Sequence, residues 1–303
     1  MFTLLLGFLF ALQDIDRPDL LHSFSSAAQV EIITGLNREA PALVFPDVAI
    51  SAHAGIVIDT ITNGVRWSRL PNEPMPIASL SKLMTALVLV DLNPDWNMPV
   101  TILPDDNDSI EGSRLYVGEG EIVSLQDLFY TSLVGSANNA TRAMARATGL
   151  STDAFVRRMN KKAAALGMTD SIFYEVTGLD PRNQASAADV ARLAQAAFAE
   201  PRIHAALQTP VHDLVTIDKG KFHRIKSTNA LLDAGVIAKT GYLDEAGYTY
   251  ASLSPAGTLV VLLRQWSSDE RFSQAGALIQ WAELPFIKSI FTEQEKYARL
   301  REE

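Results

Sequence analysis

A serine and a lysine three positions apart, Ser79 and Lys82, are the residues best suited to covalent chemistry. A serine hydroxyl is a weak nucleophile and needs a neighbouring base. On a helix these two positions share a face, and a lysine in a dry site near the positive end of a helix dipole favours its neutral amine. That amine can accept the hydroxyl proton. The pair alone also fits a serine N-cap followed by an exposed lysine.

A second polar motif, Ser136-Ala137-Asn138, follows Val134-Gly135 in a break between two predicted helices. Such a loop can point two short side chains into a cleft. The Ser136 hydroxyl can relay a proton to a leaving amine, and the Asn138 amide can hold both Lys82 and a substrate carbonyl. Taken alone, these residues also fit a capping loop, because Ser and Asn are common helix caps.

A third motif, Lys239-Thr240-Gly241, ends a predicted strand that begins near Val236. Glycine lets another backbone approach a strand closely. The lysine and threonine offer a cation and a hydroxyl to a carboxylate. Alone, the motif also fits an ordinary strand end with a turn glycine.

Helices are expected to carry the first two motifs. The segment from Leu80 to Leu92 is apolar on nearly all sides, which predicts a buried helix that Asn93-Pro94 stops. Ser124 with Asp127 resembles a capping box that opens a helix to about Leu133. Further helices are predicted over 139–148, over 152–166 after a Ser151 cap, from a Ser186 cap to about Ala199 before Pro201, and over 268–281.

Strands are predicted at both ends of the helical block. Residues 54–60 and 65–70 flank an Asn-Gly turn and form a hairpin. Later β-rich segments cover 211–217, 221–225, 236–240, 248–254 and 258–263. This order predicts an α+β fold, in which one antiparallel sheet of about five strands, drawn from both chain ends, packs against a mostly helical block.

Composition narrows the function classes. The 303 residues carry a formal net charge of −9, so nucleic acid is not an expected partner, because phosphate binding needs clustered Lys and Arg. There are no cysteines, which excludes disulfides, thiolate metal sites and a cysteine nucleophile. None of the five histidines falls in a motif.

The N-terminal residues Met1 to Leu12 are nearly all apolar. They are too few to span a bilayer and suit the apolar region of a signal peptide, but the basic start is missing because the first cation is Arg17. Both an incomplete export signal and a frayed terminus fit. We expect an N-terminal segment over 1–45, a catalytic domain over 46–285 and a tail over 286–303. No stable membrane anchor is evident.

Together, in this order and context, the three motifs match the signature of penicillin-interacting serine enzymes. The chain resembles the low-molecular-weight penicillin-binding proteins of the D-alanyl-D-alanine carboxypeptidase family. The resemblance covers about 54–281 and includes further runs at 77–85, 112–114, 167–169, 177–180 and 244–248.

The resemblance implies a reaction and a set of roles. Similar enzymes attack a peptide ending in D-Ala-D-Ala with the serine, release the last residue and hydrolyse the acyl-enzyme with water. Carried over, Ser79 is the nucleophile and Lys82 the general base for acylation. Ser136 and Asn138 position the substrate and shuttle protons.

The remaining implied roles concern binding. Lys239, Thr240 and Gly241 hold the substrate strand and its carboxylate, with help from Arg271. The backbone N–H groups of Ser79 and Tyr242 form the oxyanion hole. The resemblance implies no metal and no cofactor. The implied partners are peptidoglycan stem peptides and β-lactams, which places the enzyme on the periplasmic or cell-wall side of the membrane. The chain resembles the single-domain branch of the family, which includes enzymes that cut D,D-crosslinks, and carboxypeptidase and endopeptidase both stay open.

Three alternatives share some of these features. A class A-like β-lactamase needs a glutamate and, four residues on, an asparagine to activate water; Glu175 is present, but position 179 is leucine. The loop therefore offers no evident carboxylate–asparagine pair. A penicillin-sensing receptor domain is normally attached to a membrane-spanning segment, and none is visible. A non-catalytic binding module is disfavoured because every motif residue is intact.

Overall fold

The computed structural model describes residues 49–107 and 112–284. The predicted segments 1–45 and 286–303 lie outside these residues. Within the described ranges, no helix is long and apolar enough to cross a membrane.

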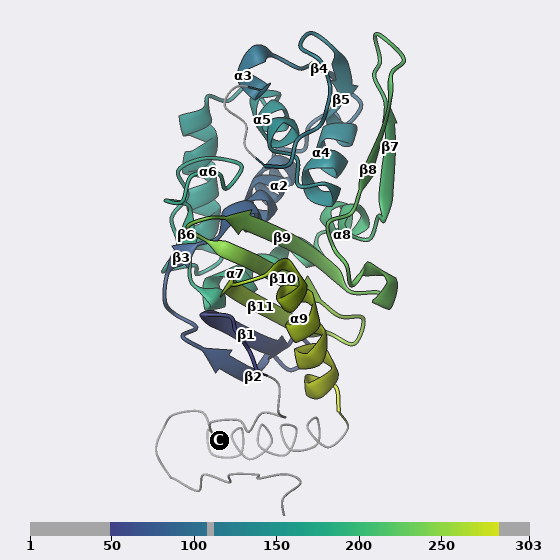
Figure 1. Ribbon diagram of the computed structural model, residues 1–303. Helices are drawn as coiled ribbons and strands as arrows, with labels where there is room; N and C mark the ends of the chain where they lie inside the picture. The colour runs from purple at the N-terminus through teal and green to yellow at the C-terminus, as the bar shows by residue number, and fades with distance from the viewer. Residues whose placement is uncertain (1–48, 108–111, 285–303) are drawn as a thin grey trace, which may run out of the picture. The chain divides into compact units, whose positions relative to one another are not determined.

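A five-stranded antiparallel sheet organises the molecule (Figure 1), with the strand order β2-β1-β11-β10-β9. The strands are β1 (Ala54–Asp59), β2 (Gly64–Arg69), β9 (Ile237–Leu243), β10 (Gly247–Leu253) and β11 (Thr258–Gln265). Two strands come from the N-terminal side and three from the C-terminal side, which confirms the predicted sheet of about five strands drawn from both sides of the helical block. The central strand β11 joins the two groups because it pairs with both β1 and β10.

The apolar run of β11 reflects helices that cover the sheet. Seven of its eight residues are buried, which fits a strand covered on both faces rather than on one. Helix α7 (Ala187–Ala199) and helix α9 (Ser268–Ala282) both contact β11, and Figure 1 shows α9 in front of the sheet and α7 behind it.

A block of helices packs beside the β9 edge of the sheet. It contains α2 (Ser81–Asp91), α4 (Leu125–Val134), α5 (Asn138–Arg146) and α6 (Thr152–Ala165). The first nine residues of α2 are buried, which confirms the buried helix that its composition predicts. The predicted caps are also confirmed, because the hydroxyls of Ser124, Ser151 and Ser186 each accept a hydrogen bond from the backbone N–H three residues on.

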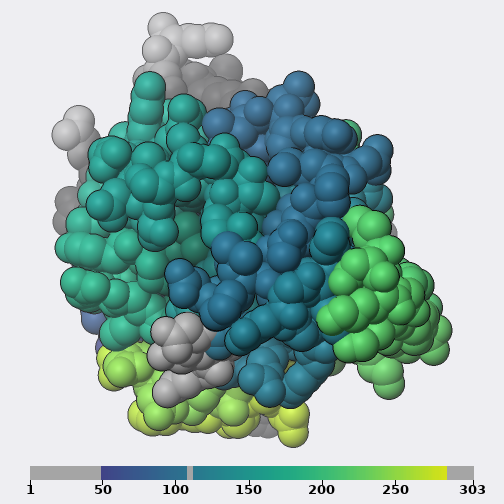
Figure 2. Space-filling model, turned by 90° about the horizontal axis from the view of Figure 1, so that it is seen from above, coloured from purple at the N-terminus to yellow at the C-terminus, as the bar shows by residue number. Residues whose placement is uncertain are grey.

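Several smaller elements differ from the prediction. Pro201 does not simply end a helix; it begins α8 (Pro201–Leu207), where Glu200 caps the Arg202 N–H. Strands β7 (Val211–Val215) and β8 (Phe222–Lys226) form a hairpin of their own outside the main sheet, and Figure 2 shows it at one margin of the helical block. The remaining short elements are β3 (Met75–Pro76), β4 (Pro99–Thr101), α3 (Pro104–Asn107), β5 (Ile122–Ser124), β6 (Gln184–Ala185) and 3-10 turns at Ala78–Leu80 and Leu232–Ala234.

Candidate active site

Ser79 lies in the 3-10 turn that leads into α2. The sequence predicts it at the helix N-terminus, and the structure places it in the turn just before the first helical residue. The preceding residue, Ala78, has a φ of 48°, a left-handed conformation that is uncommon for a residue with a side chain. Backbone strain of this kind concentrates at functional sites. Ser79 itself is partly exposed, whereas both of its neighbours are buried.

Lys82 is completely buried one turn along from Ser79. Its Nζ lies 2.8 Å from Ser79 Oγ, 2.7 Å from Asn138 Oδ1 and 2.7 Å from the backbone oxygen of Thr177. The Asn138 and Thr177 oxygens can only accept hydrogen bonds. A neutral amine therefore donates its two hydrogens to them and turns its lone pair towards the Ser79 hydroxyl.

The surroundings of Lys82 favour this neutral form. Burial lowers its pKa to about 7; the Glu175 carboxylate opposes the shift and Arg142 adds to it. A pKa near neutrality leaves a substantial fraction of the amine able to accept a proton.

Ser136 lies in the break between α4 and α5, where the sequence predicts it, whereas Asn138 lies at the end of that break. Ser136 has a φ of 59°, and its Oγ accepts a 2.7 Å hydrogen bond from Lys239 Nζ. Asn138 is the first residue of α5, and its backbone N–H donates to the Ser113 carbonyl oxygen at 2.8 Å. The second motif thus touches both lysines, Lys82 through Asn138 and Lys239 through Ser136.

The third motif lies in the middle of β9, not at the strand end predicted from the sequence. The strand continues to Leu243 because the hairpin with β10 keeps its pairing through Tyr242–Tyr248 to Leu243–Gly247. β9 is also the last strand in the sheet order. At Gly241 an added Cβ would come within 2.9 Å of the Ser79 backbone nitrogen and 2.4 Å of Thr249 Oγ1. Glycine is therefore required for this strand to pass so close to Ser79.

Lys239 is as deeply buried as Lys82. Its Nζ donates to Ser136 Oγ and, at 2.8 Å, to the backbone oxygen of Thr240. Burial, together with the nearby Lys82 and Arg271, holds the pKa of Lys239 well below its usual value. The neighbouring Thr240 hydroxyl is 2.7 Å from Thr228 Oγ1, a partner that none of the sequence motifs indicates.

Arg271 and Tyr242 complete the wall formed by the sheet edge. Arg271 Nη1 donates to the Gly241 carbonyl oxygen at 3.2 Å, and its guanidinium lies 5.2 Å from the Tyr248 ring. Its buried Nε has no hydrogen-bond partner among the described residues. The Tyr242 ring is half exposed, its hydroxyl donates to Asp244 at 2.7 Å, and it lies 4.5 Å from the Tyr248 ring. Both residues thus present polar groups beside Gly241.

A cleft of about 490 Å³ connects these residues. Seven of the nine predicted site residues line it, and Lys82 and Lys239 are fully buried. The lining side chains and glycines are Ser79, Gly112, Ser113, Ser136, Asn138, Gly178, Leu179, Thr228, Thr240, Gly241, Tyr242, Leu243, Asp244, Glu245, Tyr248 and Arg271. The structure therefore brings all three motifs to one place.

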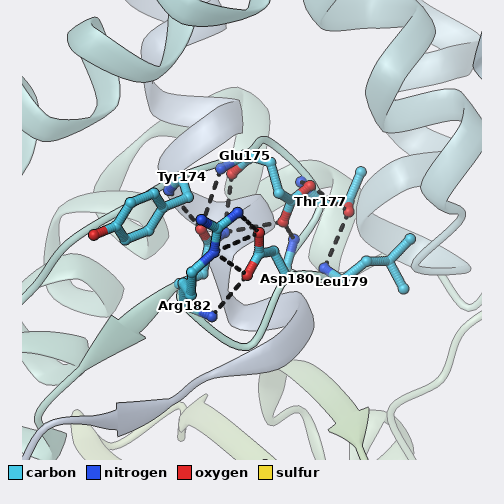
Figure 3. Close-up of polar contacts among 8 residues, drawn as sticks. Tyr174, Glu175, Thr177, Leu179, Asp180 and Arg182 are labelled. Atoms are coloured by element: carbon cyan, nitrogen blue, oxygen red, sulfur yellow. Dashed lines mark hydrogen bonds and ion pairs between the residues drawn. The ribbon is translucent and has the colours of Figure 1, made fainter.

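The loop after α6 corrects one prediction from the sequence. A carboxylate–asparagine pair is present, because Asn183 Nδ2 donates to Glu175 Oε1 at 3.0 Å. The partner is eight residues away rather than four, since a turn at Asp180–Arg182 returns the chain across the loop (Figure 3). Sequence spacing alone does not reveal this pairing. The role of the Thr177 carbonyl was likewise missed, because a backbone oxygen leaves no residue-type signal.

Comparison with known proteins agrees with this geometry. Residues 39–261 match the family described as D-alanyl-D-alanine carboxypeptidase. A D-alanyl-D-alanine endopeptidase of Haemophilus influenzae is 35% identical over 202 residues, covering 65% of this chain and 68% of that protein. Another from Pseudomonas aeruginosa is 30% identical over 264 residues and covers 84% of both chains.

Solved structures show the same fold. A mutant of the Streptomyces K15 DD-transpeptidase has a TM-score of 0.71 and 25% identity, over 78% of this chain and 98% of that one. An evolved penicillin-binding protein homologue from Mycobacterium tuberculosis has a TM-score of 0.72 and 27% identity, over 80% and 95%. The family match spans more than half of the 303 residues. The chain therefore belongs to the D-alanyl-D-alanine carboxypeptidase family of low-molecular-weight penicillin-binding proteins, as its three motifs predict.

Proposed function

We propose that this protein is a serine D,D-peptidase that cleaves D-alanyl peptide bonds of peptidoglycan through an acyl-enzyme on Ser79, and that penicillins acylate the same serine. The observation that carries the proposal is the coordination of Lys82, whose amine touches Ser79 Oγ and two fixed acceptors. This arrangement supplies what a serine nucleophile needs, a base within hydrogen-bond reach that a third group orients.

Acylation follows from these contacts. Lys82 takes the Ser79 proton as Ser79 Oγ bonds to the substrate carbonyl carbon, and the backbone N–H groups of Ser79 and Tyr242 hold the oxyanion. Ser136 then gives a proton to the leaving amine and regains one from the protonated Lys82 while the C–N bond breaks. The hydrogen bond that Lys239 donates to Ser136 Oγ makes that hydroxyl more acidic.

The edge position of β9 explains how a peptide is held. An extended substrate can add to an exposed strand edge through main-chain hydrogen bonds. Arg271 then supplies a cation, and Lys239 and Thr240 supply hydrogen-bond donors, for its terminal carboxylate. Gly241 keeps this edge close enough to Ser79 for the scissile carbonyl to reach the nucleophile.

Deacylation uses the same base. After the leaving peptide or D-alanine departs, water enters the vacated side of the ester and Lys82 takes its proton, which restores Ser79. A β-lactam keeps its leaving amine tethered, so we expect the penicilloyl ester to be hydrolysed slowly. Cleavage of crosslinks is supported by the two relatives reported above, both of which are D-alanyl-D-alanine endopeptidases.

We further propose that residues 46–285 form the catalytic domain and that it works on the periplasmic or cell-wall side of the membrane, where stem peptides are found. The match to the family over 39–261 supports this extent. The formal charge of −9 is consistent with a peptide rather than a nucleic acid as partner.

Digestion of purified peptidoglycan fragments, followed by mass spectrometry, tests the reaction. Loss of one D-alanine identifies a carboxypeptidase, and conversion of crosslinked dimers to monomers identifies an endopeptidase. Stopped-flow hydrolysis of a chromogenic cephalosporin runs in parallel. Fast cephalosporin turnover with neither muropeptide reaction would make the protein a β-lactamase and contradict the proposal.

A further inference from the structure

We propose that Glu175 is a positioning residue for the acylation step. Its carboxylate folds the 174–183 loop so that the loop backbone holds Lys82 and supports the nucleophile turn, the 3-10 turn Ala78–Leu80 that carries Ser79. The inference rests on the proposed role of Lys82 as base. It assigns Glu175 a function different from that of a carboxylate that activates the deacylating water.

The Glu175 carboxylate accepts four hydrogen bonds within its own loop (Figure 3). Oε2 accepts from the backbone N–H and the hydroxyl of Thr177, both at 2.6 Å. Oε1 accepts from the Gly178 N–H and from Asn183 Nδ2. A carboxylate offers about four acceptor sites, so these donors occupy the group and make it the centre of the loop.

The residues that Glu175 holds contact Lys82 and its helix directly. The Thr177 carbonyl oxygen is one of the three partners of Lys82 Nζ, at 2.7 Å. The Val176 carbonyl oxygen accepts a 2.6 Å hydrogen bond from Thr85 Oγ1, on the next turn of α2. Two successive carbonyls therefore attach the loop to α2 beside the base, and a shift of the loop would redirect the lysine lone pair.

The same loop supports the nucleophile turn. Gly178 has a φ of 87°, and an added Cβ there would lie 1.9 Å from the Ala78 carbonyl oxygen. The Asn183 carbonyl oxygen accepts from the Ile77 N–H at 3.2 Å, and Asn183 Nδ2 lies 3.1 Å from Ser81 Oγ. Glu175 and Asn183 thus connect both ends of the loop to the residues around Ser79.

The position of Glu175 argues against direct activation of water on the acyl-enzyme. Glu175 does not line the cleft that contains Ser79. It lines a separate cavity of about 710 Å³, and Leu179 is the residue that both spaces share. Because its lone pairs are engaged and it faces the other cavity, Glu175 lacks the geometry of a general base for deacylation.

Glu175→Gln tests the proposal, with Asp180→Asn as a matched control. In Glu175→Gln an amide NH₂ replaces one carboxylate oxygen and faces donors that it cannot accept from, so the loop loses two of its contacts. Asp180 is a carboxylate on the same loop, and its side chain pairs with the exposed Arg182 and accepts the Arg182 N–H. The amide oxygen of the Asp180→Asn variant can still accept that N–H, so the turn is kept. Replacing Asp180 removes an equal charge without touching Thr177 or Gly178.

The measurement is the rate of acylation by a fluorescent penicillin as a function of pH. We expect Glu175→Gln to acylate at least about tenfold more slowly, because the base is no longer oriented. The acidic limb of its pH–rate profile should move to lower pH, because the pKa of Lys82 loses the raising effect of Glu175 while burial and Arg142 still lower it. Asp180→Asn should match the wild type both in its acylation rate and in the pH of its acidic limb. Glu175→Asp keeps the negative charge on a shorter side chain. It should give an intermediate acylation rate, and the acidic limb of its pH–rate profile should stay at the wild-type pH.

Two outcomes would overturn the proposal. In the first, Glu175→Gln acylates at the wild-type rate but accumulates acyl-enzyme on a muropeptide, which would make Glu175 a base for deacylation. In the second, the fraction of acylation activity that Glu175→Gln loses equals the fraction of the variant that is unfolded, and its acidic limb stays at the wild-type pH. If Glu175→Gln does not fold, a wild-type acylation rate in Glu175→Asp overturns the proposal instead. Failure of the wild type to be labelled at all would contradict the proposed function.

Discussion

At the scale of single residues, two equally buried lysines have different surroundings. Lys82 Nζ meets a hydroxyl and two acceptors that cannot donate, whereas Lys239 Nζ meets Ser136 Oγ and one carbonyl of its own strand. The first arrangement orients a lone pair towards Ser79. The second directs a donor at the Ser136 hydroxyl, for which we propose a role at the leaving group. Residue identity alone does not separate these roles, and the partners do.

Ser79→Ala removes the attacking oxygen. We expect complete loss of covalent labelling by a fluorescent penicillin, with a melting temperature close to that of the wild type, because Ser79 is partly exposed and not a core residue. Gel fluorescence and thermal unfolding measure the two quantities. Normal labelling of the folded variant would remove Ser79 from its assigned role.

Lys82→Arg keeps a positive charge but removes the neutral amine, because a guanidinium stays protonated at ordinary pH. We expect acylation to fall by at least about a hundredfold, the low end of general-base effects. In the wild type the acylation rate should rise with pH around the Lys82 pKa of about 7. Lys161→Arg, on the exposed surface of α6, is the control and should leave the rate unchanged. A comparable rate in both variants would rule out a base at position 82.

The sequence predicts the motif residues of the site because three short motifs occur together in a characteristic order. It does not predict the Glu175–Asn183 pair, which depends on a turn that reverses the chain. It also cannot indicate that the Thr177 carbonyl binds Lys82, since every residue carries the same backbone oxygen. Local chemistry is thus visible in the sequence, whereas contacts made by folding are not.

At the scale of elements, the contact between β9 and the nucleophile turn sets how closely Gly241 approaches Ser79. The hairpin partner β10 holds β9 in register, and Thr249 of β10 also donates to the Ile77 carbonyl oxygen at 3.1 Å. The sheet edge is therefore attached to the turn that carries Ser79, so the strand and the nucleophile must move together.

Gly241→Ala tests this contact. The new Cβ would meet Thr249 Oγ1 at 2.4 Å and the Ser79 nitrogen at 2.9 Å, so strand and turn must separate. We expect acylation to fall at least about tenfold, since misplacement of this size affects reacting groups strongly. The control is Gly276→Ala in α9, where the nearest atom is 4.0 Å away. It should keep the wild-type acylation rate. Its free energy of unfolding, measured with urea, should rise by roughly 0.5–1 kcal/mol, because alanine suits a helix interior better than glycine. Equal acylation rates in the two variants would contradict the required close approach.

Elements with local signals were predicted well. Hydroxyl caps mark the starts of α4, α6 and α7, and an Asn-Gly turn marks the β1–β2 hairpin, whose Asn63 has a φ of 59°. Elements that depend on distant partners were missed. The two-residue strands β3 and β6 exist only because they pair with each other across more than a hundred positions, and no periodicity can develop in two residues.

At the scale of the whole molecule, strands from both sides of the helical block close one sheet around β11, and loops that connect the helices form most of the other wall of the cleft. Hydrophobic patterning predicts the α+β class. It does not predict strand order, because β1 pairs with β11 through residues about two hundred positions apart. Nor does it separate the β7–β8 hairpin from the main sheet. The cleft lies where strand β9 meets the helical block and therefore depends on this long-range closure.

Burying Lys82 also links activity to the stability of the whole fold. The unfolded chain keeps its proton up to about pH 10.4, whereas the folded chain releases it around a pKa of about 7. Between these values the unfolded state binds more protons, so the free energy of unfolding rises with pH, by up to about 1.4 kcal/mol per pH unit for one such group. Below about pH 7 both states are protonated and this contribution to the slope disappears.

Lys82→Met should remove this slope while filling a similar space. Urea unfolding of wild type and variant between pH 7.5 and 9 gives the difference in slope, and the subtraction cancels effects common to both, including self-repulsion of a chain with a formal charge of −9. We expect the free energy of unfolding of the wild type to rise by up to about 1.4 kcal/mol per pH unit relative to that of the variant. Lys161→Met, at an exposed position, should show the wild-type slope. Parallel slopes for wild type and Lys82→Met would mean that Lys82 stays protonated throughout this range, and a protonated amine has no lone pair with which to activate Ser79.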